Sequence, residues 1–172
     1  MKITTPKAEA SAPVRIGVIA DTHGRFDPEL FQCFAGVTHI LHAGDIGDRE
    51  VIRQLERIAP VTAISGNVDG FSRSGFPAER VIELAGRLIA LRHVVYEGQE
   101  VNVTAARYLD RVRPDICVFG HTHRPFSTWR GTAFLFNPGS AGPKRFRLPR
   151  TVGLLRLFPA HLESEHVFLG EC

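Results

Sequence analysis

Four short segments of the sequence carry side chains that commonly bind metal ions. Carboxylate oxygens and imidazole nitrogens suit divalent ions of the manganese, iron and zinc type, and the segments contain no thiolate of the kind that structural zinc sites use. Two such ions in one site could bind both the phosphoryl oxygens of an ester and a nucleophilic water. The segments are Asp21-Thr22-His23, Gly44-Asp45, Gly66-Asn67 and Gly120-His121-Thr122-His123.

Each segment alone has an ordinary structural explanation. An Asp-x-His after a strand is commonly a turn with a helix N-cap, and Gly-Asn near an acid is commonly a turn. Gly120-His121-Thr122-His123 is more specific, because two histidines one residue apart on a loop are poor material for a hydrophobic core. All four segments in this order, each behind an apolar run, predict one shared site.

The elements that must position these segments are short apolar runs that end in polar loops. Residues 14–20, 38–43, 61–64 and 115–119 are each predicted to form a buried strand. Ligand sites in open α/β sheets assemble at the carboxyl ends of the strands. We therefore expect the four loops to converge in space despite their separation in sequence.

The rest of the chain predicts helices mainly in the first half and strands in the second. Asp27 is an expected N-cap, with Pro28 at the first helical position of a helix running through Phe34, and Asp48 is the next N-cap. A third helix is expected over residues 105–112 and a hairpin over residues 80–92. Further strands are expected at residues 127–130, 133–137, 151–158 and 163–168. This order favours an α/β (α+β) fold, a two-sheet β-sandwich flanked by helices.

Length and composition place few limits on function. The chain has 172 residues, and we expect one domain over residues 14–172 after a disordered tail over residues 1–13. A formal net charge of +3 gives no strong signal for nucleic-acid binding. The N-terminus lacks the apolar stretch of a secretory signal, and no run approaches the roughly 20 apolar residues that span a bilayer. We expect a cytoplasmic protein without membrane contact, with Cys33, Cys117 and Cys172 as reduced thiols.

Taken as an ordered set, the motifs resemble those of the calcineurin-like metallophosphoesterases. The set is Asp-x-His, Gly-Asp, Gly-Asn-x-Asp, a histidine and Gly-His-Thr-His, and it covers nearly the whole chain from Ile16 to the strands after Arg150. The short length, the Gly-His-Thr-His-Arg-Pro segment and Asn-Pro-Gly-Ser at residues 137–140 resemble the small YfcE-like branch of bacterial and archaeal phosphodiesterases. The resemblance implies a metal-dependent phosphoesterase in which a water or hydroxide between two metals attacks phosphorus, with no protein nucleophile.

The same resemblance implies roles for seven side chains. Asp21, His23 and His123 would bind one metal, Asn67, His93 and His121 would bind the other, and Asp45 would bridge the two. The metals would be two divalent ions, with manganese expected and iron, nickel or zinc as alternatives. Catalysis through the metals and the bridging water would depend on Asp45, Asn67 and His121.

Two positions depart from the pattern of the family. Many relatives have a histidine after the Gly-Asn pair that can protonate the leaving oxygen, whereas this chain has Val68, which can donate no proton. Activated diesters should therefore react better than alkyl phosphomonoesters, because their leaving groups need little protonation. His93 is followed by Val94 instead of the usual glycine, although it still ends an apolar run over residues 88–92 as a metal ligand should.

Several arginines and one lysine are candidates for contacting an anionic substrate. Arg124 directly follows His123 and could contact a phosphate, with a salt bridge as the alternative. The densest basic run is either a solvated loop or an electropositive rim that attracts the substrate. It contains Lys144, Arg145, Arg147 and Arg150.

Four further histidines lie outside the predicted ligand set. His42 precedes the Gly-Asp pair on a predicted strand and could orient Asp45 from behind. His39 lies on the same strand and is expected to have no role in the site. His161 and His166 fall in the C-terminal hairpin and are predicted to be surface residues.

The leading prediction is an enzyme that hydrolyses the phosphodiester bonds of a small or nucleotide-like substrate. A different class of function is a non-catalytic protein-interaction scaffold, like the retromer subunit that shares the predicted fold. Among enzymes, a nucleotide phosphatase or a cyclic-nucleotide phosphodiesterase is the alternative. All seven predicted ligand positions hold a suitable residue, which favours the enzyme over the scaffold. Homo-oligomers are expected only because members of the resembled family commonly self-associate.

Overall fold

The computed structural model describes residues 12–70, 75–145 and 147–170, and it contains three helices and twelve strands within those ranges. In chain order they are β1 (Val14–Ile19), α1 (Leu30–Cys33), β2 (His39–His42), α2 (Arg49–Glu56), β3 (Val61–Ala63), β4 (Glu79–Leu84), β5 (Arg87–Arg92), β6 (Tyr96–Glu97), β7 (Glu100–Val101), α4 (Val103–Val112), β8 (Ile116–Val118), β9 (Pro125–Arg130), β10 (Ala133–Pro138), β11 (Thr151–Leu157) and β12 (Leu162–Phe168).

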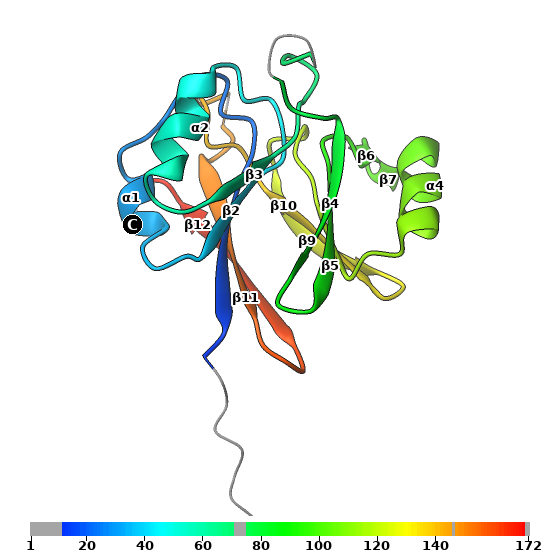
Figure 1. Ribbon diagram of the computed structural model, residues 1–172. Helices are drawn as coiled ribbons and strands as arrows, with labels where there is room; N and C mark the ends of the chain where they lie inside the picture. The colour runs from blue at the N-terminus through cyan, green and yellow to red at the C-terminus, as the bar shows by residue number, and fades with distance from the viewer. Residues whose placement is uncertain (1–11, 71–74, 146, 171–172) are drawn as a thin grey trace, which may run out of the picture.

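Ten of these strands form two sheets that pack face to face (Figure 1). The first has the order β12-β11-β1-β2-β3, and the second has the order β4-β5-β8-β10-β9. Val18 and Leu41 of the first sheet share a fully buried core with Leu91 and Val118 of the second. Helices α1 and α2 cover the outer face of the first sheet, and α4 covers the outer face of the second. The predicted sandwich flanked by helices is confirmed.

Parallel pairing brings the polar strand ends to one end of the sandwich. β1 pairs in parallel with β2, and β2 with β3. In the second sheet β8 pairs in parallel with both β5 and β10. The carboxyl ends of parallel neighbours lie at the same edge of a sheet, and both sets of ends lie toward the top of Figure 1.

The helices follow their capping residues, with one correction. Asp48 caps α2 as predicted, because its carboxylate accepts a hydrogen bond from the backbone N–H of Glu50 at 2.8 Å. Helix α1 begins at Leu30, two residues later than predicted, and ends before Phe34. The reason is a tight turn ahead of the helix, in which the N–H of Leu30 donates to the carbonyl of Asp27.

Two elements differ from prediction after β5. Helix α4 begins at Val103, two residues early, because Asn102 caps it by accepting a hydrogen bond from the N–H of Ala105 at 2.8 Å. The strands β6 and β7 were not predicted, since each has two residues and is too short to show an alternating pattern. They form a small antiparallel ribbon next to α4.

The cysteines depart from the expectation of three reduced thiols. Cys33 is disulfide-bonded, so the prediction was wrong for this residue. Cys117 is a buried free thiol, and burial raises its pKa to about 12. Cys172 lies outside the described residues. Spacing along the sequence cannot reveal a disulfide, which depends on a short distance between two Cα atoms in the folded chain.

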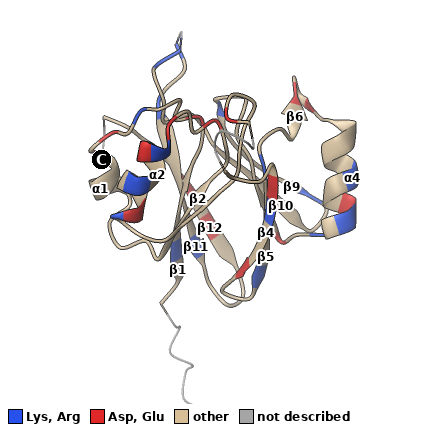
Figure 2. Cartoon of the chain, turned by 45° about the horizontal axis from the view of Figure 1, so that its top comes forward, with Lys and Arg blue, Asp and Glu red and all other residues tan. Residues whose placement is uncertain are grey.

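Acidic and basic residues are spread over many elements of the chain, and both α2 and α4 carry residues of both signs (Figure 2). Within the described residues, none of the helices is both long enough and apolar enough to cross a membrane. The predicted N-terminal tail lies almost entirely outside the described part of the chain, which begins at residue 12.

Candidate metal centre

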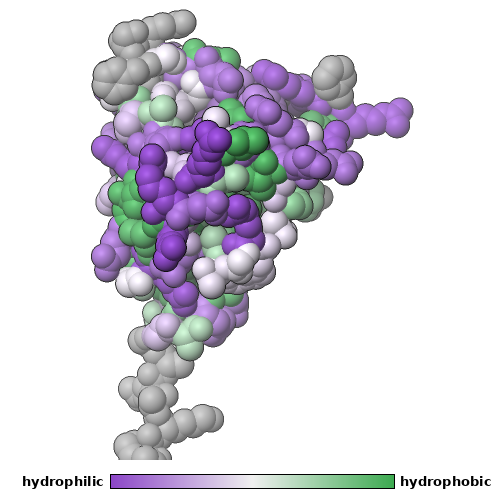
Figure 3. Space-filling view, turned by 90° about the vertical axis from the view of Figure 1, so that its right-hand side faces the viewer, coloured by the Kyte–Doolittle hydropathy of each residue, from purple (hydrophilic) through white to green (hydrophobic). Residues whose placement is uncertain are grey.

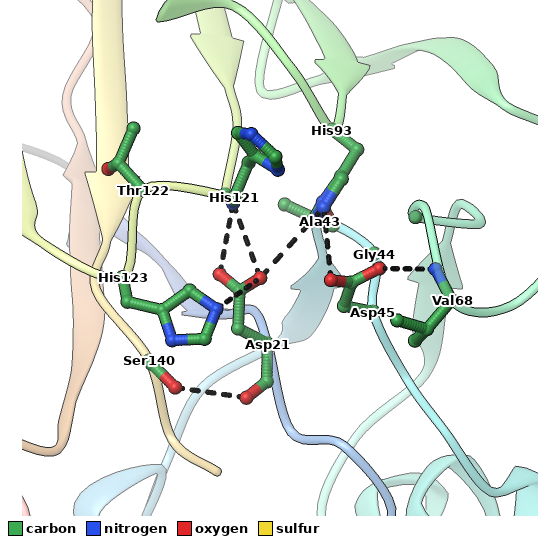
Figure 4. Close-up of polar contacts among 12 residues, drawn as sticks. Asp21, Ala43, Gly44, Asp45, Val68, His93, His121, Thr122, His123 and Ser140 are labelled. Atoms are coloured by element: carbon green, nitrogen blue, oxygen red, sulfur yellow. Dashed lines mark hydrogen bonds and ion pairs between the residues drawn. The ribbon is translucent and has the colours of Figure 1, made fainter. Parts of the chain in front are cut away.

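The loops after β1, β2, β5 and β8 meet between the two sheets at one end of the sandwich (Figure 4). Backbone hydrogen bonds tie neighbouring loops together. The N–H of Asp21 donates to the carbonyl of Gly44 at 2.9 Å, and the N–H of Gly120 donates to the carbonyl of His93 at 3.0 Å. The strand-end loops are therefore held side by side, as their common position after apolar runs predicted.

Four side chains from three of these loops form a compact cluster of possible metal ligands. One donor atom from each of Asp21, His23, Asp45 and His123 lies within 4.8 Å of the others. Nε2 of His123 is 3.4 Å from Oδ1 of Asp21, and Nε2 of His23 is 3.9 Å from Oδ2 of Asp45. The two Nε2 atoms are 3.4 Å apart. Donor atoms at these separations can surround a single cation.

His93 adds a fifth donor beside this cluster. Its Nδ1 donates to the carbonyl of Ala43 at 2.7 Å, which directs Nε2 toward the two carboxylates (Figure 4). Nε2 lies 3.4 Å from Oδ2 of Asp45 and 3.9 Å from Oδ1 of Asp21 without completing a hydrogen bond to either. A metal-binding histidine commonly donates its other ring N–H to a carbonyl in this way. The side chain thus has the orientation of a ligand, despite the valine that follows it.

His121 and Asn67 lie on the more exposed side of the centre. The His121 ring centroid is 5.5 Å from that of His93, with the planes at 80°, and its side chain is exposed. Asn67 is also exposed and lines a pocket of about 270 Å³ together with His93. Val68 is 48% exposed, and its backbone N–H donates to Oδ1 of Asp45 at 3.0 Å. The structure brings these two predicted ligands to the edge of the cluster rather than into it.

The backbone at the predicted ligands is unusual. Seven non-glycine residues of the described chain have a positive φ, a conformation that is uncommon for residues with a Cβ. Five of the seven are predicted ligands. Strained backbone of this kind collects at functional sites, where the surrounding structure imposes it. The five are Asp21 (53°), His23 (48°), Asp45 (54°), His121 (70°) and His123 (58°).

Glycine is required where two of these loops approach most closely. A Cβ on Gly66 would overlap both the backbone nitrogen and the carboxylate of Asp45. Gly44 has a φ of 95°, and a Cβ there would lie 2.9 Å from Gly66. The loops after β2 and β3 can therefore touch only because both positions lack a side chain.

Asp69 is a buried carboxylate that joins the same two loops. It accepts hydrogen bonds from the N–H groups of Ile46 at 3.0 Å, Gly47 at 2.9 Å and Gly66 at 2.7 Å. Three backbone donors compensate the cost of burying this carboxylate. The Gly-Asn-x-Asp motif contained Asp69, but only the structure gives it a role, which is to position the loop that carries Asp45.

The Asn-Pro-Gly-Ser segment supports the other loops. The buried amide of Asn137 donates to the carbonyl of Gly120 at 2.9 Å and to the hydroxyl of Thr122 at 3.0 Å. The hydroxyl of Ser140 donates to the carbonyl of Asp21 at 3.0 Å. This segment therefore positions the loops that carry the predicted ligands, a role that no sequence spacing indicated.

His42 is a neutral, fully hydrogen-bonded core residue. The Thr22 hydroxyl donates to the carbonyl of Ile46 at 3.0 Å, so it must accept from Nε2 of His42 at 2.9 Å. Nδ1 of His42 then accepts from the N–H of Gly44 at 3.2 Å. Burial lowers the pKa of His42 to about 4, which keeps it neutral. It supports the backbone next to Asp45 rather than the carboxylate itself.

The other three histidines make contacts outside the donor cluster. His39 bonds to the hydroxyl of Thr62 at 2.8 Å, and His161 is exposed, as predicted for a surface residue. His166 is half-buried rather than fully exposed, because its ring stacks on Phe136 with centroids 4.8 Å apart.

The electrostatics of the cluster favour a cation. Burial favours the protonated form of Asp45, but the nearby His93 imidazole and the hydrogen bond from the N–H of Val68 lower its pKa to about 2. Burial also disfavours a charged His93 ring, but Asp45 and Asp21 outweigh burial and raise the pKa of His93. Burial lowers the pKa of His23, which leaves its ring neutral. Two carboxylates thus attract positive charge to one small volume.

The basic residues are placed differently from what their spacing indicated. Arg124 is exposed, and its N–H lies 3.5 Å from the hydroxyl of Thr122. Arg145 reaches the centre itself, with its guanidinium 3.4 Å from Nε2 of His23. Arg150 is bound to Asp27 at 2.7 Å and to the carbonyl of Gly142 at 2.9 Å. Within the predicted basic run, Arg145 is therefore close enough to the donor cluster to contact a bound anion. Arg150 instead stabilises the loop through its bonds to Asp27 and Gly142.

The side chains present fit a divalent cation. Buried polar atoms are normally hydrogen-bonded, and leaving one without a partner costs roughly 1–3 kcal/mol. Nε2 of His93 is such an atom, and it faces two carboxylates. A mixed set of carboxylate oxygens and imidazole nitrogens suits manganese, iron and zinc. A cation among these donors would satisfy Nε2 and balance the charge of the carboxylates.

Known proteins resemble this chain along nearly its whole length. The profile of the calcineurin-like phosphoesterase superfamily domain matches residues 14–158. A probable metallophosphoesterase of Methanothermobacter thermautotrophicus is 33% identical over 162 residues, which cover 90% of this chain and 92% of the relative.

Two solved structures share the fold at lower sequence identity. Vacuolar protein sorting 29 from Cryptosporidium parvum has a TM-score of 0.73 and 18% identity, covering 92% of this chain and 99% of that protein. A structure described as a novel archaeal phosphodiesterase has a TM-score of 0.70 and 20% identity, covering 90% of this chain and 99% of that protein. At these identities the likeness concerns the fold alone.

Proposed function

This chain belongs to the calcineurin-like phosphoesterase superfamily, and on that premise we propose that it hydrolyses phosphodiester bonds with two divalent cations. The position of Asp45 is the observation that carries the proposal. Its Oδ2 is 3.9 Å from Nε2 of His23 and 3.4 Å from Nε2 of His93. A carboxylate close to histidines from two different loops could contact a cation on each side.

The remaining ligands divide into two groups around Asp45. Asp21, His23 and His123 would hold one cation, and Asn67, His93 and His121 would hold the other. We propose manganese as the native ion, with iron, nickel or zinc as alternatives, because this donor set suits several of these ions. When bound, the two cations would lower the pKa of a water molecule and neutralise the phosphoryl oxygens.

The chain's own residues keep this donor set ready for a cation. The low pKa of Asp45 keeps its carboxylate ionised across the physiological range. The carbonyl of Ala43 accepts the Nδ1 proton of His93, so Nε2 presents its lone pair whenever that nitrogen is deprotonated. Asp69 and Asn137 hold the loops in place through hydrogen bonds to backbone groups. The four clustered side chains, Asp21, His23, Asp45 and His123, therefore need little rearrangement to bind a metal.

Val68 limits which leaving groups can depart. It is exposed at the edge of the site and has no group that can give a proton to a leaving oxygen. A leaving group that is stable as an anion needs no such proton, whereas an alkoxide does. We propose that activated phosphodiesters are better substrates than alkyl phosphomonoesters for this reason.

Arg145 is our candidate for the residue that contacts the substrate phosphate. Its guanidinium lies 3.4 Å from Nε2 of His23, a proposed metal ligand, whereas Arg124 lies one residue beyond the loop that carries His123. A guanidinium binds two oxygens of a phosphate at once, and a flexible exposed side chain can reorient to do so. Arg145 is therefore our candidate at the metal centre, and Arg124 stays a candidate for contacting another part of the substrate.

The decisive experiment measures metal-dependent turnover and metal content in the same preparations. Wild-type protein supplied with manganese should hydrolyse bis(p-nitrophenyl) phosphate faster than an alkyl phosphomonoester. Asp45→Asn should lower kcat/KM at least about a hundredfold, because a ligand to both cations is lost. Asp110→Asn, on the exposed surface of α4, is the matched control and should keep full activity. Faster cleavage of the monoester would refute the preference for diesters.

A protein-interaction scaffold is the alternative function, and the shared fold with vacuolar protein sorting 29 is the observation in its favour. Full metal occupancy with no hydrolysis of diesters, nucleoside monophosphates or cyclic nucleotides would support the scaffold. Turnover of cyclic nucleotides or monophosphates alone would instead support a cyclic-nucleotide phosphodiesterase or a nucleotide phosphatase. These outcomes separate the three functions with one panel of substrates.

A further inference from the structure

A second pocket lies beside the metal centre, on the side of the molecule that carries α4. It has a volume of about 410 Å³, within the range of small-molecule sites. Figure 3 looks onto this side of the molecule, where hydrophobic surface lies among hydrophilic side chains. The residues that line the pocket include Tyr96, Phe119, Thr122, Arg124, Pro125 and Phe126.

This pocket and the metal centre are built on the same two chain segments. Tyr96 follows the proposed ligand His93 by three residues, and Phe119 precedes His121 by two. The rings of His93 and His121 are 5.5 Å apart, and the rings of Tyr96 and Phe119 are also 5.5 Å apart. Thr122, between the two histidines of the ligand loop, lines the pocket. A molecule bound here would lie directly next to the metal ligands.

Three aromatic rings shape the pocket. Tyr96 is stacked on Phe119 with an interplanar angle of 29°, and Phe126 meets Tyr96 edge-on, with centroids 5.3 Å apart and planes at 76°. Phe119 is buried, but Phe126 is 41% exposed at the start of β9. A partly exposed ring at the end of an aromatic row can stack against a planar ligand at little conformational cost.

An unpaired cation stands at the rim of this pocket. Arg92, Arg130 and Arg150 each form an ion pair with a carboxylate. None of the ion pairs found in the described part of the chain involves Arg124, which lines the pocket. An arginine beside aromatic rings suits a ligand that is planar at one end and anionic at the other.

We propose that this pocket binds the nucleobase of a nucleotide phosphodiester whose phosphorus lies at the metal centre. Phe126 and Tyr96 contact the base, Phe119 supports Tyr96 from behind, and Arg124 attracts the sugar-phosphate part of the nucleotide. The proposal rests on the phosphodiesterase function proposed above and narrows the substrate class to nucleotide diesters. Stacking tolerates every base, so little preference among bases is expected.

Two substrates with the same leaving group isolate the contribution of the pocket. The p-nitrophenyl ester of thymidine 5′-monophosphate and methyl p-nitrophenyl phosphate both release p-nitrophenolate when water attacks phosphorus. The wild type should favour the nucleotide ester about tenfold in kcat/KM, mainly through a lower KM. Phe126→Ala and Arg124→Ala should each reduce this preference, while Phe126→Trp should preserve it.

Trp129→Ala is the matched control, because Trp129 is a 58% exposed aromatic residue on the same strand that packs on Phe134 instead. It should leave the preference for the nucleotide ester unchanged. An undiminished preference in Phe126→Ala and Arg124→Ala would overturn the assignment of the pocket, while the proposed function would stand.

A binding measurement tests the pocket without turnover. By titration calorimetry, adenosine monophosphate should bind the wild type about tenfold more tightly than inorganic phosphate, and Phe126→Ala should abolish the difference. If the wild type hydrolyses neither ester but keeps this difference, the proposed function fails and the pocket stands as a nucleotide site. Equal affinity of the wild type for adenosine monophosphate and inorganic phosphate would contradict the proposal that the pocket binds a nucleobase.

Discussion

On one side of the candidate metal centre, Asp21, His23 and His123 are packed around Asp45 with donor atoms within 4.8 Å of one another. On the other side only His93 is buried, and Asn67 and His121 are exposed. We call these the His123 side and the Asn67 side. Both begin at the ends of parallel strands, yet among the described residues only the donor atoms of the His123 side lie close together.

The difference between the two sides has a physical cause. Hydrogen bonds from Ser140 and Asn137 support the loops of the His123 side, whereas Asn67 and His93 line a pocket of about 270 Å³. Metal binding to a site whose donor side chains are already close together has a smaller entropic cost of ordering those side chains. We therefore expect the His123 side to bind its cation more tightly and the exposed side to adapt to the substrate.

The largest predicted effect is the contrast between two alanine variants, one from each side. His123→Ala should weaken the tighter cation by more than about a hundredfold, beyond the loss typical of a supporting contact. Asn67→Ala should leave that cation in place and weaken only the second, by about tenfold. Manganese titration with calorimetry, followed by elemental analysis of the dialysed proteins, measures both.

The comparison of the two sides would be wrong if both variants lost the same cation with the same change in affinity. Thermal unfolding of each variant in the absence of metal controls for misfolding. His123 is buried, so its variant needs this check, whereas Asn67 is exposed.

A smaller effect is expected from the carboxylate that connects the two sides. Asp69→Asn keeps every proposed ligand but loses acceptors for the N–H groups of Ile46, Gly47 and Gly66. Supporting contacts of this kind are worth about 10- to 100-fold in metal affinity. Both cations should weaken, since Asp45 lies on this loop. The control variant Glu56→Gln, at the exposed end of α2, should change the affinity for neither cation. Unchanged metal affinity in Asp69→Asn would show that Asp69 does not support the site.

The smallest effect concerns the ion pair that anchors the loop carrying Arg145. Burial opposes ionisation of Asp27, but the hydrogen bond and charge of Arg150 outweigh burial and lower the pKa of Asp27 below its usual 3.8. A lowered pKa in the folded state stabilises the protein above the unfolded value, and the stabilisation is lost as pH falls through the folded value. Asp27→Asn should cost about 1 kcal/mol at pH 7.

Urea unfolding of wild type and Asp27→Asn measures this contribution at two pH values. The difference in free energy of unfolding should be full near pH 7 and should shrink as the pH falls below about 3.8, toward the depressed pKa of Asp27 in the folded state. An equal difference at both values would mean that the charge of Asp27 has no part in stability.

Local patterns were sufficient for most of the fold. Apolar runs and their polar ends located β1, β2, β3 and β8, and Asp48 marked the start of α2. The errors fell where a local rule competed with another interaction. The turn at Asp27 delayed α1, and β6 and β7 were too short to show a period. The superfamily was also indicated correctly by the ordered motifs.

Sequence alone determined which residue types could bind a cation and that they follow buried strands, because periodicity and strand ends are local properties of a chain. Tertiary structure alone decided which of them meet. It placed His123 in the cluster and Asn67 at its edge, and it brought Arg145 across 122 positions to His23. Distances between loops depend on how the two sheets pack, and no spacing along the chain encodes that packing directly.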